Sequence, residues 1–281
     1  MSNSHQIRFS SGINEVRNMG TDSLRDHFLV QNLFQTDHIE LVYSLQDRFI
    51  LAGVMPVYEK IDLPAFEEIT KADFFLERRE LGIINVGGNG IIVVNGTSYH
   101  LNKKDALYLG RGNKQITFKS ESKSDPALFY LNSVLAHTSY PNTFIPIKDV
   151  VPAEMGEFET ANRRNIYKII VKERIPTCQL VMGLTDLLAP STWNTFPPHT
   201  HIRRNEVYFY FDIPENQILV HLMGEPEHTR HVIMHNHEAI ISPEWSIHSG
   251  VGTAAYSFIW GMGGENLEYS DMDKVNPIDL K

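Results

Sequence analysis

The chain has 281 residues, of which 42% are hydrophobic and 21% charged, a balance typical of a globular protein large enough for two domains. Its formal net charge of -9 is spread along the length without a basic stripe, which argues against a nucleic-acid partner. The single cysteine, Cys178, excludes a framework of intrachain disulfides and agrees with a reducing compartment.

Predicted helices are few and lie early in the chain. One is expected over residues 20–32, with Asp22 or Ser23 as its N-cap, and a short helical turn over residues 64–71. After these, short segments rich in β-branched and aromatic residues, separated by Gly, Asn, Asp or Pro, predict strands. In the first half the predicted strands are residues 82–86, 90–94, 106–109, 115–118 and 127–131. A matching set follows residue 165, after a Pro-containing connection over residues 140–164.

The two halves of the chain share a pattern. Residues 105–110 (Asp-Ala-Leu-Tyr-Leu-Gly) match residues 238–243 (Glu-Ala-Ile-Ile-Ser-Pro), and counting five further reaches Gln115 in one half and His248 in the other. We interpret this as duplication of one barrel, with a metal-free first copy; chance similarity between two sets of Gly-punctuated strands is the alternative. The predicted fold class is all-β, with an N-terminal domain over residues 1–150 and a C-terminal domain over 151–281.

The second half contains the pattern His-x-His-x4-Glu, followed later by Pro-x4-His. Alternate side chains of a strand share a face, so His199 and His201 are expected to point the same way. Glu206 opens the next strand-like segment, and His248 comes from a third. Three imidazoles and one carboxylate suit a divalent metal such as zinc and leave a position for water or substrate. The spacing predicts one metal site formed by these residues.

Other histidines of the second half lack this spacing. His235 and His237 form another His-x-His pair, but Glu238 is adjacent and no spaced partner follows, which predicts a polar hairpin connection. The histidines of the polar stretch around residues 224–226 are expected at the surface: His221, His228 and His231.

The ligand spacing resembles the cupin superfamily, in which a metal lies inside a double-stranded β-helix. Trp245 stands where the second cupin motif has a glycine. Beyond that motif, a wider likeness rests on residues 43–48, 77–82, 105–110, 165–168, 178–183, 193–195, 199–208, 245–250 and 263–266. In these segments the chain resembles the 5-keto-4-deoxyuronate isomerases, also named 4-deoxy-L-threo-5-hexosulose-uronate ketol-isomerases. The resemblance implies a bicupin of two jelly-roll barrels, one Zn²⁺ per chain and a homohexamer.

The resemblance also implies an activity, the conversion of 5-dehydro-4-deoxy-D-glucuronate to 3-deoxy-D-glycero-2,5-hexodiulosonate in pectin and uronate breakdown. This is an aldose–ketose isomerisation of a small keto-uronate. Removing a proton next to an aldehyde places negative charge on oxygen, so a zinc-stabilised enediolate is the expected intermediate. The chain has no Gly-rich dinucleotide fingerprint, because strand residues rather than a helix follow the glycines of residues 87–90.

Two tyrosines are expected to face the metal. Tyr208 and Tyr210 follow Glu206 at alternate positions of one predicted strand. Tyr208 is a candidate for proton transfer, although a phenol with a pKa near ~10 needs tuning for this role. Glu265 is a further catalytic candidate.

Arginines lie in the turn between the two metal-bearing strands. Arg203 or Arg204 is expected to bind the substrate carboxylate, because a guanidinium contacts a carboxylate in bidentate fashion. Gln179 and Tyr210 are further candidates for substrate binding.

Two other functions fit the same ligand set. An iron- or nickel-dependent cupin dioxygenase uses similar ligands to activate oxygen, and a non-catalytic cupin binds a sugar without turnover. Oxygen consumption distinguishes the first from an isomerase, and turnover of an unsaturated uronate product distinguishes the second.

The sequence predicts a cytoplasmic protein with no membrane partner. Its first residues form no apolar signal region, and no apolar segment is long enough to span a bilayer.

Overall fold

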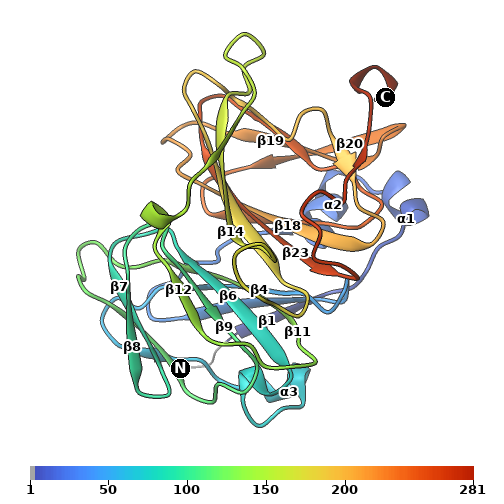
Figure 1. The fold of residues 1–281 in the computed structure, drawn as a ribbon. Coiled ribbons are helices and arrows are strands. Elements are labelled where there is room, and N and C mark those ends of the chain that lie inside the picture. The colour runs from blue at the N-terminus through green and yellow to red at the C-terminus, as the bar shows by residue number, and fades with distance from the viewer. Residues whose placement is uncertain (1–3) are drawn as a thin grey trace. The chain divides into compact units, whose positions relative to one another are not determined.

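The computed structural model describes residues 4–281 and consists mainly of β-strands (Figure 1). The chain divides into two units, each made of several segments. Unit 1 comprises residues 4–7, 32–150 and 169–181, and unit 2 comprises residues 8–31, 151–168 and 182–281. The units therefore differ from the domains predicted at 1–150 and 151–281 in the placement of residues 8–31 and 169–181.

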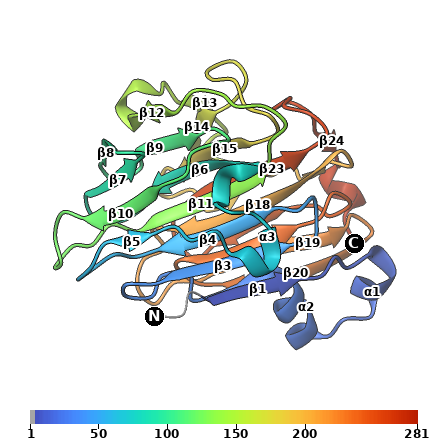
Figure 2. The ribbon, with the colours of Figure 1, turned by 90° about the horizontal axis from the view of Figure 1, so that it is seen from below.

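Unit 1 is built around a seven-stranded and a four-stranded sheet. The larger has the order β1 (Ser4–Arg8), β3 (Ile39–Ser44), β4 (Ile50–Val54), β11 (Phe129–Leu135), β6 (Arg79–Asn85), β9 (Ala106–Leu109), β12 (Thr143–Ile145). The smaller sheet has the order β5 (Ile61–Asp62), β10 (Ile116–Ser120), β7 (Gly90–Val94), β8 (Thr97–Leu101). Its strands are labelled in Figure 2. Apolar residues from both sheets, such as Leu107 and Phe118, form one buried core.

Unit 2 is built around a second pair of sheets. The larger has the order β13 (Ala153–Met155), β14 (Arg164–Ile170), β15 (Val181–Leu187), β23 (Ser257–Gly264), β18 (Arg204–Phe211), β21 (Glu238–Ser242), β2 (Leu29–Val30). The smaller has the order β16 (Trp193–Asn194), β22 (Ser249–Gly252), β19 (Leu219–Glu225), β20 (His228–Met234). A short pair, β17 (His199–Thr200) and β24 (Asp273–Lys274), completes the strands of the described residues.

The second pair of sheets repeats the strand order of the first. Strands β6, β9 and β11 take the places that β18, β21 and β23 take in unit 2. Strand β6 pairs Leu81 with Leu109, and β18 pairs Glu206 with Ser242. Matching residues 105–110 to 238–243 therefore puts Leu81 at the position of Glu206. Leu81 packs in the apolar core of unit 1, where unit 2 has a carboxylate.

The helices are short, and the predicted all-β class with few short helices is confirmed. They are α1 (Ile13–Arg17), α2 (Thr21–Phe28), α3 (Glu67–Thr70) and the 3-10 turns η1 (Phe75–Glu77), η2 (Ile147–Asp149) and η3 (Pro277–Asp279). In unit 2, α1 and α2 lie beside the strands β19 and β20 (Figure 1). Within the described residues, no helix has the length and apolar character needed to cross a membrane.

Helix α2 differs from its prediction at both ends. It begins after Gly20, which serves as N-cap without any side-chain hydrogen bond, so the predicted caps Asp22 and Ser23 were wrong. It ends at Phe28 rather than near residue 32, because the next two residues pair with β21 as strand β2. Pairing of these apolar residues with a buried strand outweighs continuation of the helix.

Candidate functional site

Side chains from three parts of unit 2 meet in one cluster. His199 lies in β17 and His201 just after it, Glu206 lies in the central strand β18, and His248 immediately precedes β22. One ligand atom from each lies within 4.8 Å of the others, and all four residues are buried. The strand pairing thus brings together residues that the sequence separates by up to 49 positions.

The donor atoms of this cluster face one another. Nε2 of His201 and Nε2 of His248 lie 2.7 and 2.9 Å from Oε2 of Glu206. Nε2 of His248 is also 3.1 Å from Nε2 of His199. Lone pairs that converge in this way in a buried position are stabilised by a cation between them, so the cluster could bind a metal ion.

Groups around the cluster orient the imidazoles. Nδ1 of His201 donates a hydrogen bond to the carbonyl oxygen of Asp271 at 2.5 Å. Nδ1 of His248 lies 3.2 Å from the hydroxyl of Ser242. Such contacts at Nδ1 fix the ring and leave Nε2 to act as the ligand atom, which is the usual arrangement around histidine-bound metals.

Burial and the mutual proximity of these groups determine the charge of the cluster. It lowers the pKa of His199 to about 2, with His248 and His201 adding to the effect, and it also lowers the pKa of His248. Burial alone would raise the pKa of Glu206, but His248 and His201 outweigh it and hold this pKa well below its usual range. The cluster therefore combines the neutral imidazoles of His199 and His248 with a carboxylate, a donor set that suits a divalent cation.

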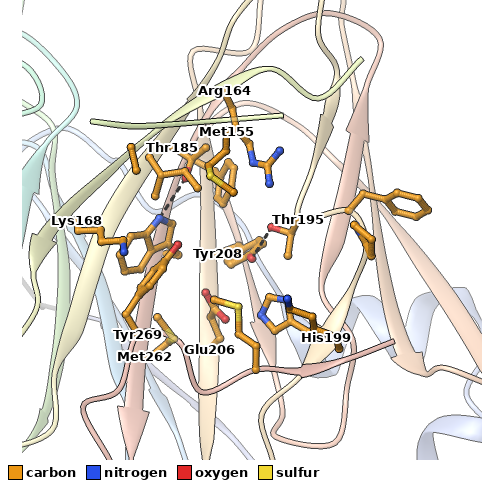
Figure 3. A pocket seen from close by; sticks show the side chains of 18 residues that line it. Met155, Arg164, Lys168, Thr185, Thr195, His199, Glu206, Tyr208, Met262 and Tyr269 are labelled. Carbon is orange, nitrogen blue, oxygen red and sulfur yellow. Dashed lines mark hydrogen bonds between the residues drawn. The ribbon is translucent and has the colours of Figure 1, made fainter. Parts of the chain in front are cut away.

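A cavity of about 410 Å³ opens beside the cluster (Figure 3). His199 and Glu206 line it, together with polar residues and an apolar wall that includes Trp260 and Met262. The polar lining residues are Arg164, Lys168, Thr185, Thr195, Tyr208, Tyr269 and Lys274. This volume and mixture of apolar walls with a few polar groups are typical of a site for a small molecule.

Arg164 supplies positive charge to this cavity. Figure 3 shows its guanidinium on the opposite side of Thr195 and Tyr208 from His199 and Glu206. One Nη donates to the carbonyl of Asn162 at 2.8 Å, and burial lowers the pKa of the side chain from its ordinary value. The cavity thus has a guanidinium at one end and the histidine and glutamate cluster at the other.

Tyr208 lies between these two ends. Its hydroxyl is 2.9 Å from that of Thr195, and its ring is 5.3 Å from the ring of His248. Burial, then the charge of Glu206, raises the pKa of Tyr208 well above its usual value. The phenol therefore keeps its proton at neutral pH and is suited to donate a hydrogen bond.

The two predicted arginines contact protein groups and do not line the cavity. Arg203 forms ion pairs with Asp271 and Asp273, at 2.5 and 2.7 Å. Arg204 donates to the backbone carbonyls of Glu268, Tyr269 and Asp271. Both side chains hold residues 268–273 in place, and Arg164 rather than either of them offers a guanidinium to the cavity.

The other predicted residues also lie outside the cavity lining. Tyr210 is fully buried, with its hydroxyl 2.8 Å from Nδ1 of His221. Glu265 is exposed, and its backbone N–H donates to the carbonyl of Arg203. Gln179 belongs to unit 1, where its backbone N–H donates to the carboxylate of Glu80 at 2.8 Å.

The surface placement predicted for three histidines holds for His228 and His231, which are exposed, but was wrong for His221. His221 is fully buried because it alternates on β19 with Leu219 and Met223, which face the interior. This alternation was a readable signal in the sequence. The hairpin predicted at residues 235–237 was wrong: these residues join β20 to β21, but the two strands belong to different sheets and do not pair.

Acid should destabilise the protein through His221. Burial, then His248, lowers its pKa to about 3, whereas an unfolded histidine titrates near ~6.5. Between these values the unfolded chain binds the extra proton, so stability is complete above pH ~6.5 and falls by up to about 1.4 kcal/mol per pH unit on acidification. Between pH 7 and 5, the free energy of unfolding measured with urea should fall less steeply for His221→Gln than for the wild type. An equal fall would contradict this role. The control His228→Gln, which removes an exposed histidine, should behave like the wild type.

The model of the KduI/IolB family matches residues 28–276. Over 280 residues the chain is 52% identical to the 4-deoxy-L-threo-5-hexosulose-uronate ketol-isomerase of Lachnospira eligens, covering 98% of this chain and 100% of the relative. It is 48% identical over 281 residues to the protein of the same name from Formosa agariphila, covering 100% of both chains.

Solved structures with low sequence identity share the fold. An IolB-like protein from Salmonella typhimurium superposes with a TM-score of 0.66 at 13% identity, covering 81% of this chain and 87% of that one. The oxalate decarboxylase of Bacillus subtilis gives a TM-score of 0.54 at 10% identity, covering 80% and 71%. The predicted bicupin architecture is confirmed. The family model and the full-length relatives together show that the chain belongs to the KduI/IolB family.

Proposed function

We propose that the protein is a 4-deoxy-L-threo-5-hexosulose-uronate ketol-isomerase, which converts 5-dehydro-4-deoxy-D-glucuronate to 3-deoxy-D-glycero-2,5-hexodiulosonate. Relatives that are 47–52% identical over essentially the whole chain carry this name. The observation that carries the proposal is that one cavity of unit 2 has a guanidinium at one end and the His₃Glu cluster at the other. An open-chain keto-uronate has the matching polarity, with a carboxylate at one end and an aldehyde beside a hydroxyl at the other.

In this proposal the carboxylate end of the substrate binds Arg164. A guanidinium in a partly desolvated position forms strong hydrogen bonds to a carboxylate, and the anion compensates its charge. The side chains of Lys168 and Lys274 add positive charge to the same lining. The apolar wall formed by Phe258, Trp260 and Met262 excludes water along the carbon chain.

The aldehyde end then lies beside His199, His201, Glu206 and His248, which we propose hold one zinc ion. When bound, the metal supplies Lewis-acid stabilisation of the negative charge that develops on the substrate oxygens. Tyr208, protonated and next to the cluster, donates a hydrogen bond to the aldehyde oxygen and passes its proton to it. The phenolate regains a proton from the neighbouring hydroxyl as that carbon becomes the ketone, and the proton that this carbon loses is returned to the former aldehyde carbon. Glu206 is occupied in the cluster, so Tyr208 is the better-placed proton carrier.

The proposed activity can be tested directly with the unsaturated uronate product of a pectin-degrading lyase, followed by NMR. We expect the aldehyde hydrate signals to be replaced by those of the 2,5-diketo product under nitrogen and without nicotinamide. Tyr208→Phe should lower kcat, because the proton donor is lost. A requirement for dioxygen would favour the dioxygenase, and binding without conversion would favour the non-catalytic sugar-binding protein.

Three finer features remain part of the proposal. Zinc as the metal, a homohexamer as the assembly and the cytoplasm as the location are expected from the resemblance of the sequence to the isomerases and from its composition. The His₃Glu donor set supports zinc, since four such ligands leave room for substrate oxygens. The isomerisation itself needs no redox-active metal.

A further inference from the structure

Unit 1 contains a second and smaller cavity, which belongs to the half without the His₃Glu cluster. Its volume is about 50 Å³, and its lining includes Tyr43, Ala72, Phe75, Arg78 and Arg79. Arg79 begins strand β6 and lies within residues 77–82, one of the segments on which the resemblance to the isomerases rests. The proposed isomerase function assigns no role to this segment.

Arg79 is a buried cation that only neutral groups contact. The residue is only 4% exposed. Nε donates to the hydroxyl of Ser133 at 3.2 Å, and one Nη donates to the carbonyls of Arg48 and Ser133. The ring of Tyr43 lies 5.7 Å from its Cζ. Across residues 4–281 no aspartate or glutamate pairs with it, and burial lowers its pKa to about 10.

The equivalent position in unit 2 is compensated. The register that places Leu81 at the position of Glu206 also places Arg79 at the position of Arg204. Arg204 donates to three backbone carbonyls, and the charges of Glu206 and Asp271 raise its pKa against the effect of burial. Unit 1 has the buried arginine at this position but no carboxylate beside it. The neighbouring Arg78, which also lines the cavity, lies 3.7 Å from the carboxylate of Glu77.

We propose that the cavity beside Arg79 is a binding site for a small carboxylate anion. An unpaired buried charge is costly. An anion that accepts hydrogen bonds from the guanidinium supplies the compensating negative charge and removes this cost. A volume of about 50 Å³, against about 410 Å³ for the cavity of unit 2, suits a carboxylate with a short tail better than a sugar. The ligand class is therefore an acetate-sized monocarboxylate.

The site can be tested by thermal unfolding of the full-length protein in sodium acetate at constant ionic strength. The sodium salt of a bulky sulfonate buffer, too large for the cavity, is the reference anion. We expect acetate to raise Tm saturably, by about 2–3 °C when its concentration is ten times Kd, and the sulfonate not to do so. Arg79→Gln should abolish the rise, and Lys114→Gln, which removes an exposed charge of the same unit outside the cavity, should retain it.

A second variant guards against misfolding of Arg79→Gln. Ala72→Leu keeps the guanidinium but fills the cavity with a larger side chain, so it should also abolish the acetate effect. A rise in Tm that persists in both variants would overturn the proposal. Loss of the rise in His199→Ala, with retention in Ala72→Leu, would place acetate at the His₃Glu cluster instead and would also overturn it.

Discussion

Replacing His199 and His201 together by alanine is expected to abolish metal binding and to lower kcat/KM by on the order of 10³-fold. The double variant removes two of the clustered ligand atoms and leaves only Glu206 and His248. A Lewis-acid metal supplies several kcal/mol of charge stabilisation, and this is the origin of the expected loss. Elemental analysis of the purified variant and assay of the isomerisation by NMR give the two readouts.

The chain provides a matched control in its other His-x-His pair. His235 and His237 lie in the connection between β20 and β21, outside the cluster. Their double replacement by alanine should leave both metal content and kcat/KM at wild-type values. Full metal occupancy in the His199→Ala, His201→Ala variant, or equal losses in both double variants, would contradict the assignment of the ligands.

The cluster could be predicted from the sequence because the spacing of its residues is set within short segments of the chain. Two histidines at alternate positions and a glutamate at the start of the next strand leave little freedom once the strands are recognised. The third histidine follows a proline by five positions, which sets it at the end of a turn. The structure brings these four residues together, as the spacing predicted.

The other end of the cavity depends on long-range strand pairing, which a single sequence does not specify. Arg164 begins β14, and only the order of strands in the larger sheet of unit 2 brings that strand to the cavity wall. One local signal was present, since Arg164, Ile166 and Lys168 alternate on β14 and all line the cavity. Arg203 was closer in sequence to the ligands, but Asp271 and Asp273 pair with it. Neighbours distant in the chain therefore decide which arginine faces the substrate.

Arg164→Ala should weaken the use of the natural substrate through loss of carboxylate recognition. A charge-assisted hydrogen bond contributes about 1.5–3 kcal/mol, which corresponds to a decrease in kcat/KM of roughly 10- to 150-fold. Arg164→Lys should recover part of the loss, because the ammonium keeps the charge but not the bidentate geometry. Steady-state assays with the keto-uronate give these values, and metal content measured in parallel shows whether the cluster is intact.

An uncharged analogue of the substrate, such as its methyl ester, separates recognition from folding. Arg164→Ala should affect the ester far less than the acid, because the deleted guanidinium acts on the carboxylate alone. Arg203→Ala is the decisive comparison, since the sequence favoured this turn for the same role while the structure places its guanidinium against Asp271 and Asp273. If Arg203→Ala discriminates between acid and ester and Arg164→Ala does not, the carboxylate binds at the turn. The substrate would then bind in the opposite orientation, with its carboxylate away from Arg164, and this result would contradict the proposed binding geometry.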